Sequence, residues 1–263
     1  MNQDKRVFFI GVTEFGLACF NKLAQMGVNI VGCVHTKDTL TARKVSGIIN
    51  ATYVDFEKVA QKHDIDCIYF DKVTSSPGEL EQQIAELSPD LIIVAGWHYI
   101  LRKELLDIPP LGVLGLHSSL LPKYRGGSPL VWQMINGEKE AGISLFYLEK
   151  GIDTGDIVGQ ETFTLEETDT IKEALLKSQE AGLKLIENYI PQVLNGTAPK
   201  KKQDESKATY VPQRIPSDGE INWGDSAVSI KNFIRAQTKP YPGAFTYIGG
   251  KKVIIWDADI IEE

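Results

Sequence analysis

The chain opens with two short apolar runs separated by a helical stripe. Residues 7–12 read VFFIGV, an apolar run closed by a glycine, and residues 28–34 form a second apolar run. Between them, apolar side chains recur at the spacing of one helical face, which ends near Gly27. A strand, a helix and a second strand in this order predict a right-handed crossover connection and a parallel sheet.

The middle of the chain repeats this alternation. Residues 91–96, LIIVAG, give the clearest buried strand, and residues 112–116 give another, which delivers His117 at its end. Residues 35–60 are mostly polar and are predicted to hold a short helix followed by a strand at 51–54. The other predicted strands are 68–70, 143–147 and 157–164, and the other predicted helices are 79–87, 130–135 and 168–190, the last capped by Thr168 or Asp169.

The composition changes at residues 195–206, which are rich in Lys, Gly, Pro and Asp. This segment separates a first domain, residues 1–200, from a smaller second domain, residues 206–263. A helix is predicted at 226–236 and a hairpin around a later pair of glycines. The whole pattern predicts an α/β fold: a doubly wound, mostly parallel sheet with a small β-rich C-terminal domain.

Composition excludes several classes of protein. The chain has 263 residues, of which 43% are apolar, and no stretch approaches the ~20 apolar residues that cross a bilayer. A net charge of −7 gives no overall attraction to nucleic acid, and the three lysines at 200–202 either contact phosphate or belong to a solvated linker. The three cysteines have no CxxC spacing, which is typical of thiols in a reducing compartment, so a cytoplasmic location is expected.

The candidate chemistry lies after two of the predicted strands. His117 follows one, and the aromatic segment 97–99, WHY, follows another. Ligands of doubly wound sheets bind at these carboxyl ends, so the aromatic residues either line a ligand or cap the core. An acidic corner, residues 153–156, comes later in the chain. An imidazole beside a carboxylate can move protons near neutral pH, although such a pair also occurs as a purely structural contact. No metal site is predicted.

Two motifs tie these residues to a known family. Residues 117–126 read HSSLLPKYRG, and residues 151–156 read GIDTGD. At this separation they resemble the two signature motifs of the formyltransferases that use 10-formyltetrahydrofolate. Residues 218–223, DGEINW, and 239–245, KPYPGAF, resemble the C-terminal part shared by methionyl-tRNA and amino-sugar formyltransferases. The resemblance covers nearly the whole chain and implies a Rossmann-like formyltransferase domain.

The resemblance also implies roles for individual residues. In this family a primary amine attacks the formyl carbon of the folate, with His117 managing protons and Asp153 positioning the histidine. The residues expected to bind the folate are Trp97, Tyr99, Ile100, Leu101, Glu149, Gly151, Ile152 and Asp156. Those expected near the acceptor are Ser119, Lys123, Tyr124, Arg125 and Tyr241, with bracing of the loop as an equal alternative for Lys123, Tyr124 and Arg125.

One position departs from the family pattern. Two residues before the histidine the family carries an asparagine, and here that position is Gly115. The asparagine amide would donate a hydrogen bond to the developing oxyanion, and loss of such a donor typically costs ~10²–10³ in rate. Three explanations remain open. A hydroxyl of Ser118 or Ser119, or an ordered water, takes over as donor; the chain carries a single substitution; or the protein binds formylfolate without efficient transfer.

The acceptor is inferred by elimination among the branches of the family. The methionyl-tRNA enzymes carry a basic insert in the first domain, which the segment after residue 38 lacks. From Glu205 onward seven Lys and Arg stand against eight Asp and Glu, so no electrostatic footprint for tRNA is evident. The expected partner is a nucleotide-linked amino-deoxysugar, with methionyl-tRNA as the alternative. No nucleic acid or membrane partner is expected, and the resemblance alone suggests a homodimer.

Overall fold

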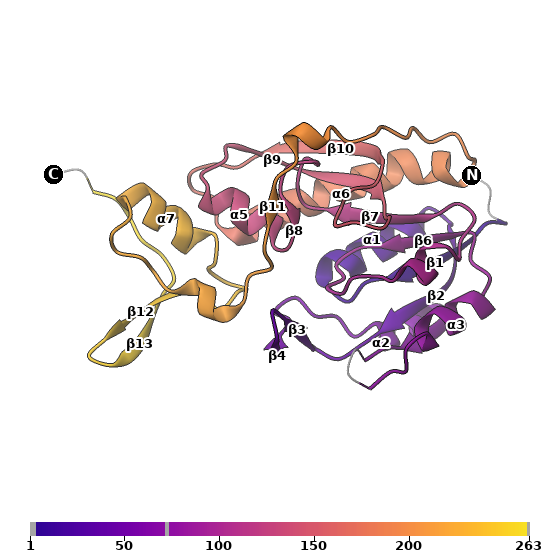
Figure 1. Ribbon diagram of the computed structural model, residues 1–263, viewed down its shortest axis with the longest axis horizontal. Coiled ribbons are helices and arrows are strands. Elements are labelled where there is room, and N and C mark those ends of the chain that lie inside the picture. Colours follow the sequence, from indigo (N-terminus) through magenta and orange to yellow (C-terminus); the bar gives the residue numbers. More distant parts are fainter. Residues whose placement is uncertain (1–3, 72–73, 262–263) are drawn as a thin grey trace.

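The structure of the protein is a computed structural model that describes residues 4–71 and 74–261. Its centre is a seven-stranded sheet (Figure 1). In spatial order its strands are β10 (Ile157–Thr164), β9 (Glu140–Tyr147), β7 (Val113–His117), β6 (Leu91–Val94), β1 (Arg6–Ile10), β2 (Asn29–His35) and β5 (Asp66–Tyr69). The strands from β7 to β5 run parallel, and β9 and β10 pair antiparallel at one edge. The predicted α/β class with a mostly parallel sheet is confirmed.

Helices cover both faces of this sheet. They are α1 (Glu14–Gln25), α2 (Phe56–His63), α3 (Glu79–Glu86), α4 (Lys103–Leu106) and α6 (Ile171–Leu194). Phe9 and Ile93 pack with α1, α2 and α6 on one face, whereas Phe8 and Ile92 pack with α3 and α4 on the other. All four side chains are fully buried. Each such burial stabilises the fold by about 1.5–3 kcal/mol, which is why these strands appear as uninterrupted apolar runs in the sequence.

Residues 35–60 differ from the prediction. They form a hairpin of β3 (Thr39–Ala42) and β4 (Val45–Ile49), which pairs with no other strand of the described chain. The two turn residues, Arg43 and Lys44, both have positive φ, at 48° and 66°. Asn and Gly are the residues that usually mark such a turn, so the sequence carries no signal for it. The predicted strand at 51–54 is reduced to a single bridge between Tyr53 and Thr13, and the short helix of this region, α2, begins at Phe56, after that position rather than before it.

The longest helix also starts and ends later than predicted. Thr170, rather than Thr168 or Asp169, caps α6, because its side chain accepts a hydrogen bond from the backbone N–H of Lys172 and forms a capping box with Glu173. The helix continues through Pro191 to Leu194. No described helix combines the length and apolar character needed to span a bilayer.

The chain after α6 returns across the sheet before it forms the C-terminal part (Figure 1). On the way β11 (Tyr210–Val211) pairs in parallel with β8 (Arg125–Gly126), which precedes α5 (Pro129–Ile135). The remaining elements are the 3-10 helices η1 (Glu205–Lys207) and η2 (Pro216–Gly219), α7 (Ala227–Arg235), β12 (Ala244–Ile248) and β13 (Lys251–Ile255). The predicted C-terminal helix and hairpin are both present. The domain boundary at 195–206 stays a prediction.

Candidate active site

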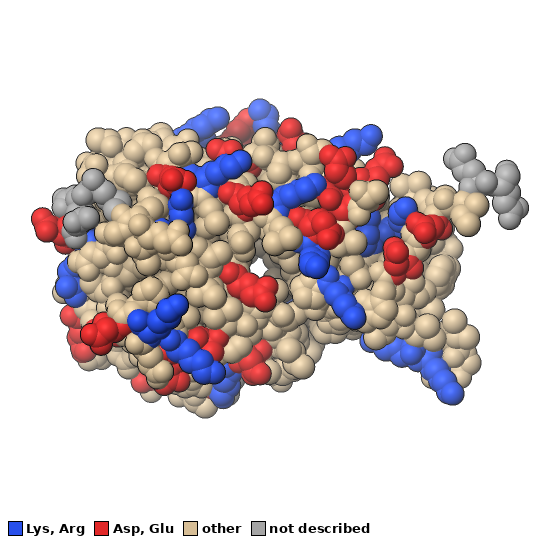
Figure 2. All heavy atoms as spheres, turned by 180° about the vertical axis from the view of Figure 1, so that it is seen from behind, with Lys and Arg blue, Asp and Glu red and all other residues tan. Residues whose placement is uncertain are grey.

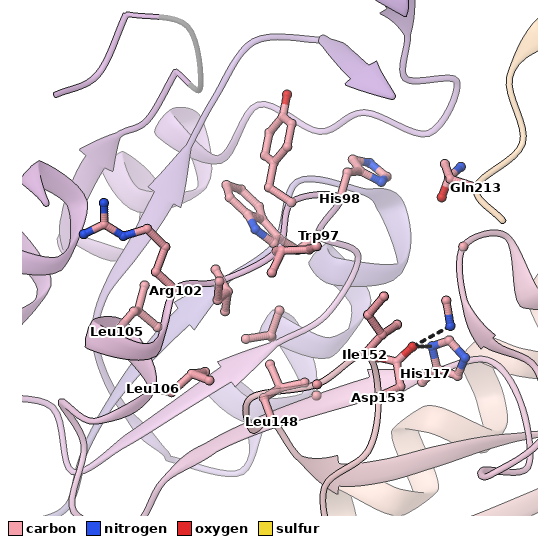
Figure 3. A pocket seen from close by; sticks show the side chains of 18 of the residues that line it. Trp97, His98, Arg102, Leu105, Leu106, His117, Leu148, Ile152, Asp153 and Gln213 are labelled. Carbon is pink, nitrogen blue, oxygen red and sulfur yellow. Dashed lines mark hydrogen bonds and ion pairs between the residues drawn. The ribbon is translucent and has the colours of Figure 1, made fainter. Parts of the chain in front are cut away.

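A cavity of about 960 Å³ lies where the parallel strands β6 and β7 end. The segments that form its wall are residues 96–102 after β6, the end of β7, and residues 148–153 after β9. The rim includes residues 41–43 of the β3–β4 hairpin and residues 211–213. The latter belong to the linker, residues 195–219, which runs from the end of α6 to the end of η2. This is the position at which doubly wound sheets bind their ligands. Figure 3 shows His117 and Asp153 together at one end of the cavity.

His117 and Asp153, the two residues expected to handle protons, lie together in this cavity. The imidazole Nδ1 lies 3.6 Å from Asp153 Oδ2, an ion-pair distance. The other nitrogen, Nε2, lies 2.8 Å from the backbone carbonyl oxygen of Tyr124. A carbonyl oxygen only accepts hydrogen bonds, so Nε2 carries a proton and donates it. In the neutral ring Nδ1 is then the nitrogen without a proton, and it faces the Asp153 carboxylate.

Backbone atoms of the loop between β7 and α5 hold this pair in place. The N–H of Gly126 donates to Asp153 Oδ2 at 2.7 Å. Asp153 itself has φ 54°, a left-handed conformation that costs about 1–3 kcal/mol for a residue other than glycine. The amide of Gln203 offsets this cost by donating to the Asp153 carbonyl oxygen at 2.8 Å. Asp153 is therefore fixed through both its side chain and its backbone.

Arg125 joins this loop to the linker and has no exposed side-chain surface. Its guanidinium donates twice to Glu205, at 2.6 and 2.8 Å, and twice to Gln203 Oε1, at 2.7 and 3.1 Å. A further hydrogen bond reaches the hydroxyl of Tyr210 at 2.8 Å. The hydrogen bonds from Arg125 lower the pKa of Glu205, and the same carboxylate raises the pKa of Arg125. Arg125 was expected either to contact the acceptor or to brace the loop, and these contacts support bracing of the loop.

Gly115 lies in the cavity wall beneath two large side chains. A Cβ atom built at this position would lie 2.9 Å from Leu148 Cδ2 and 3.0 Å from Phe146 Cε1. Contacts this short require one or both neighbours to move. Leu148 and Phe146 therefore occupy the space that an asparagine at position 115 would need. An asparagine at position 115 would thus displace the end of the Leu148 side chain.

The serine hydroxyls that were considered as replacement donors point away from the cavity. Ser118 Oγ is 3.0 Å from the Ser178 hydroxyl of α6, and Ser119 Oγ donates to the carbonyl oxygen of Lys123 at 2.6 Å. Ser119 has no exposed surface, and neither serine lines the cavity. This geometry gives no support to a serine hydroxyl in place of the asparagine amide. Ser119 instead shapes the turn that leads to Tyr124.

The opposite end of the cavity is aromatic and aliphatic. Phe70, Trp97 and Tyr99 contact one another, with ring centroids 5.5–5.9 Å apart. Trp97 Nε1 is buried and has no hydrogen-bond partner among the described residues, so an acceptor on a bound ligand would satisfy it. Ile100 and Ile152 line the cavity with 85% and 51% of their surface exposed. Exposed apolar surface inside a cavity is typical of a ligand-binding wall.

The structure brings together ten of the residues proposed from the sequence. The cavity is lined by Gly115, His117, Asp153, Trp97, Tyr99, Ile100, Leu101, Glu149, Gly151 and Ile152. The others lie elsewhere. Asp156 is 3.9 Å from Lys202 Nζ, and the Tyr124 hydroxyl donates to Glu138 at 2.6 Å. Tyr241 packs in a separate core, where burial raises its pKa to about 12. Lys123 is exposed outside the cavity.

Polar residues of the cavity that sequence reasoning did not single out include Arg43, Arg102 and Gln213, and it named His98 only as part of the segment 97–99. The amide of Asn50 is 3.0 Å from His98 Nε2 and donates to it. Desolvation by the surrounding wall lowers the pKa of His98 to about 4, although the ring remains open to the cavity. His98 is therefore neutral at physiological pH. Its contact with Asn50 joins residues 48 positions apart in the sequence, so the fold was needed to find it.

Replacement of Arg125 by methionine should lower the free energy of unfolding by about 2–3 kcal/mol, because Gln203 and Tyr210 lose a charged hydrogen-bond partner. Chemical denaturation monitored by tryptophan fluorescence measures the change. The matched control is Lys207→Met, which removes an exposed linker cation paired with Asp204 at 3.3 Å and should change stability by less than about 0.5 kcal/mol. Equal stability of Arg125→Met and the unaltered protein would show that this network does not fasten the linker.

Comparison with known proteins agrees with this geometry. Residues 5–190 match the formyl transferase family, and residues 215–263 match the formyl transferase C-terminal domain. A methionyl-tRNA formyltransferase from Caldanaerobacter subterraneus is 32% identical over 98% of this chain and 81% of its own length. The bifunctional polymyxin resistance protein ArnA from Wigglesworthia glossinidia brevipalpis is 36% identical over 97% of this chain, which spans only 38% of that larger protein.

Solved structures share the fold at lower sequence identity. A 4-N formyltransferase from Francisella tularensis has a TM-score of 0.75 and 19% identity, covering 98% of this chain and 100% of that one. An N-formyltransferase from Helicobacter canadensis, solved with folinic acid and dTDP-3-aminofucose, has a TM-score of 0.72 and 21% identity, covering 95% and 86%. The family match spans most of the chain and includes the His117–Asp153 pair. The chain is a formyl-transferring enzyme and belongs to the formyl transferase family.

Proposed function

We propose that the protein transfers a formyl group from 10-formyltetrahydrofolate to the primary amine of a nucleotide-linked amino-deoxysugar. The observation that carries the proposal is the compact shape of the acceptor side of the cavity. The β3–β4 hairpin has a two-residue turn, and its tip reaches the linker through Arg43 and Asp218, 2.6 Å apart. A cavity of about 960 Å³ bordered in this way suits a small acceptor.

The aromatic end of the cavity fits the folate donor. A pterin is a flat ring system with hydrogen-bonding edges, and the Phe70–Trp97–Tyr99 cluster offers ring faces beside the unpartnered Trp97 Nε1. Leu148 and Ile152 add apolar surface on the other wall. The bound donor supplies an activated formyl group. Two solved relatives carry folinic acid and 5-formyltetrahydrofolate in their structures, which supports a folate-type donor here.

His117 is the residue that moves the proton. Its Nε2 proton is committed to the Tyr124 carbonyl oxygen, so Nδ1 takes the proton that the amine loses as the new C–N bond forms. The same proton then passes to N10 of the folate as the bond between N10 and the formyl carbon breaks, which leaves tetrahydrofolate and the formamide. The Tyr124 carbonyl oxygen sets this tautomer, and Asp153, held by Gly126 N–H, pairs with the imidazolium once Nδ1 is protonated. Gly115 supplies no side-chain donor, so this pair carries the charge changes of the transfer without an asparagine amide.

The charge distribution supports a small acceptor rather than tRNA. On the face seen in Figure 2, acidic and basic side chains are interspersed and no continuous basic surface is visible. The net charge is −7. Proteins that bind nucleic acid usually gather Lys and Arg on one face, since the phosphate backbone dominates their affinity. The 32% identity to a methionyl-tRNA formyltransferase makes charged initiator tRNA the alternative acceptor to be tested.

Acceptor profiling by mass spectrometry tests the proposal. The full chain is incubated with 10-formyltetrahydrofolate and UDP-, dTDP- or GDP-linked amino sugars, and the formylated product is detected. At least one amino sugar should be formylated, and His117→Gln should lower that rate by ~10²–10⁴ while folinic acid still binds. Turnover of charged initiator tRNA together with no turnover of any amino sugar would sink the proposal.

The packing around Gly115 makes a second prediction. Gly115→Asn should lower the free energy of unfolding by about 1–3 kcal/mol through overpacking against Leu148 and Phe146, and it should not raise the transfer rate. Gly115→Asn combined with Leu148→Ala should recover part of the lost stability, because the shorter side chain makes room. Denaturation curves and initial rates of the two single variants and the double variant give the answer. A single Gly115→Asn variant that is both stable and faster would contradict this account of the site.

A further inference from the structure

The tip of the β3–β4 hairpin carries an arginine to the rim of the cavity. Arg43 Nη1 donates to Asp218 Oδ2 of η2 at 2.6 Å, a contact between residues 175 positions apart. Arg43 also lines the cavity, and 46% of its side chain stays exposed. Figure 1 shows the hairpin standing away from the central sheet and reaching towards the segment that holds η2. The arginine is therefore paired and yet accessible from inside the cavity.

Arg43 is a permanently charged side chain on the linker side of this cavity. Among the described residues that line the cavity, Arg43 and Arg102 are the only two with a Lys or Arg side chain. Figure 3 places Arg102 at the aliphatic end, away from His117, and places Gln213 on the same side as His117. Arg102 is also engaged by Glu81 at 3.0 Å. An anionic acceptor that presents its amine to His117 thus meets Arg43 rather than Arg102.

We propose that Arg43 binds the diphosphate of the acceptor by exchanging Asp218 for phosphate oxygens. This inference rests on the proposed function, since it assigns the phosphate subsite of the same acceptor. A guanidinium forms paired, charge-assisted hydrogen bonds with phosphate, and a diphosphate carries more negative charge than one carboxylate. Exchange of one anionic partner for another keeps the cation paired both before and after the acceptor binds.

Asp218 keeps its position when Arg43 moves from its carboxylate to the phosphate. Asp218 Oδ2 also accepts the backbone N–H of Ile215 at 2.9 Å, so the carboxylate retains a partner. Arg214 fixes the same segment by donating to the carbonyl oxygen of Asp218 and to Gln237, while its guanidinium lies 4.8 Å from the Trp132 ring centroid. These contacts make the linker the stationary half of the exchange.

The hairpin is the half that moves. No residue of β3 or β4 is fully buried, and a two-stranded hairpin alone is only marginally stable in water. Both turn residues, Arg43 and Lys44, adopt positive φ, where glycine or asparagine would be easier to accommodate. An arginine at this backbone conformation, with its side chain on the cavity rim, points to a role for that side chain.

Calorimetric binding of UDP, dTDP and GDP to the full chain tests the subsite, with folinic acid as the ligand of the opposite end. Arg43→Gln should weaken binding of the preferred nucleoside diphosphate ~10–100-fold, the loss expected for a charge-assisted contact. Lys44→Gln, its matched neighbour on the same turn, should stay within about twofold because Lys44 lies outside the cavity lining. Asp218→Asn removes the competing carboxylate and should strengthen binding. Folinic acid should bind all four proteins alike.

The following outcomes would contradict the inference. If the unaltered protein binds a nucleoside diphosphate and Arg43→Gln binds it equally well, the phosphate subsite is wrong while the proposed function stands. If the unaltered protein binds folinic acid and no nucleoside diphosphate, both are wrong. Should Arg43→Gln also lose folinic acid because the hairpin no longer folds, Asp218→Asn decides alone, and an affinity no higher than that of the unaltered protein rejects the exchange.

Discussion

The carboxylate of Asp153 is the contact on which the rest of the site depends. One oxygen, Oδ2, lies 2.7 Å from the N–H of Gly126 and 3.6 Å from His117 Nδ1. It therefore joins the end of a parallel strand to the loop that follows it. Because the loop carbonyl of Tyr124 takes the Nε2 proton of His117, the same loop also decides which nitrogen of the ring can react. Loss of this carboxylate would free both the ring and the loop.

Two residues, Gln203 of the linker and Arg125 of the loop before α5, keep Asp153 in its strained conformation. Gln203 holds the Asp153 carbonyl oxygen, and Arg125 in turn holds Gln203. The linker is thus part of the active site rather than a simple connection. The same segment continues to Asp218, which meets the β3–β4 hairpin across the rim. The linker therefore holds Asp153 through Gln203 and borders the rim of the cavity through Asp218.

The sequence predicted the central sheet because buried parallel strands appear as apolar runs in the sequence. These runs located β1, β6 and β7. It also predicted His117 and Asp153, whose motifs lie at the ends of strands. It failed for the β3–β4 hairpin, whose turn residues give no turn signal, and for contacts made by backbone atoms, such as Tyr124 O and Gly126 N, which no side-chain identity reveals. Arg43, His98 and Gln213 come to one cavity only through the fold. The pairing of the buried Arg125 with Glu205 could not be told from a phosphate contact by sequence position alone.

Gly115 shows how a missing side chain can alter the rest of a site. Leu148 and Phe146 fill the volume above it, so the wall is apolar where a hydrogen-bond donor was expected. The site then depends more heavily on the charge that His117 can gain and Asp153 can stabilise. An apolar wall also strengthens the electrostatic interaction within that pair, since fewer water molecules screen it.

The kinetics of Asp153→Asn test this dependence most directly, because the substitution keeps the shape of the side chain and removes its charge. With the amino sugar that the enzyme formylates fastest, we predict a rate of transfer lower by ~10²–10⁴ and an affinity for folinic acid within a few-fold of the unaltered protein. A variant that transfers formyl groups at the unaltered rate would contradict the account, because His117 would then need no carboxylate to hold or stabilise it.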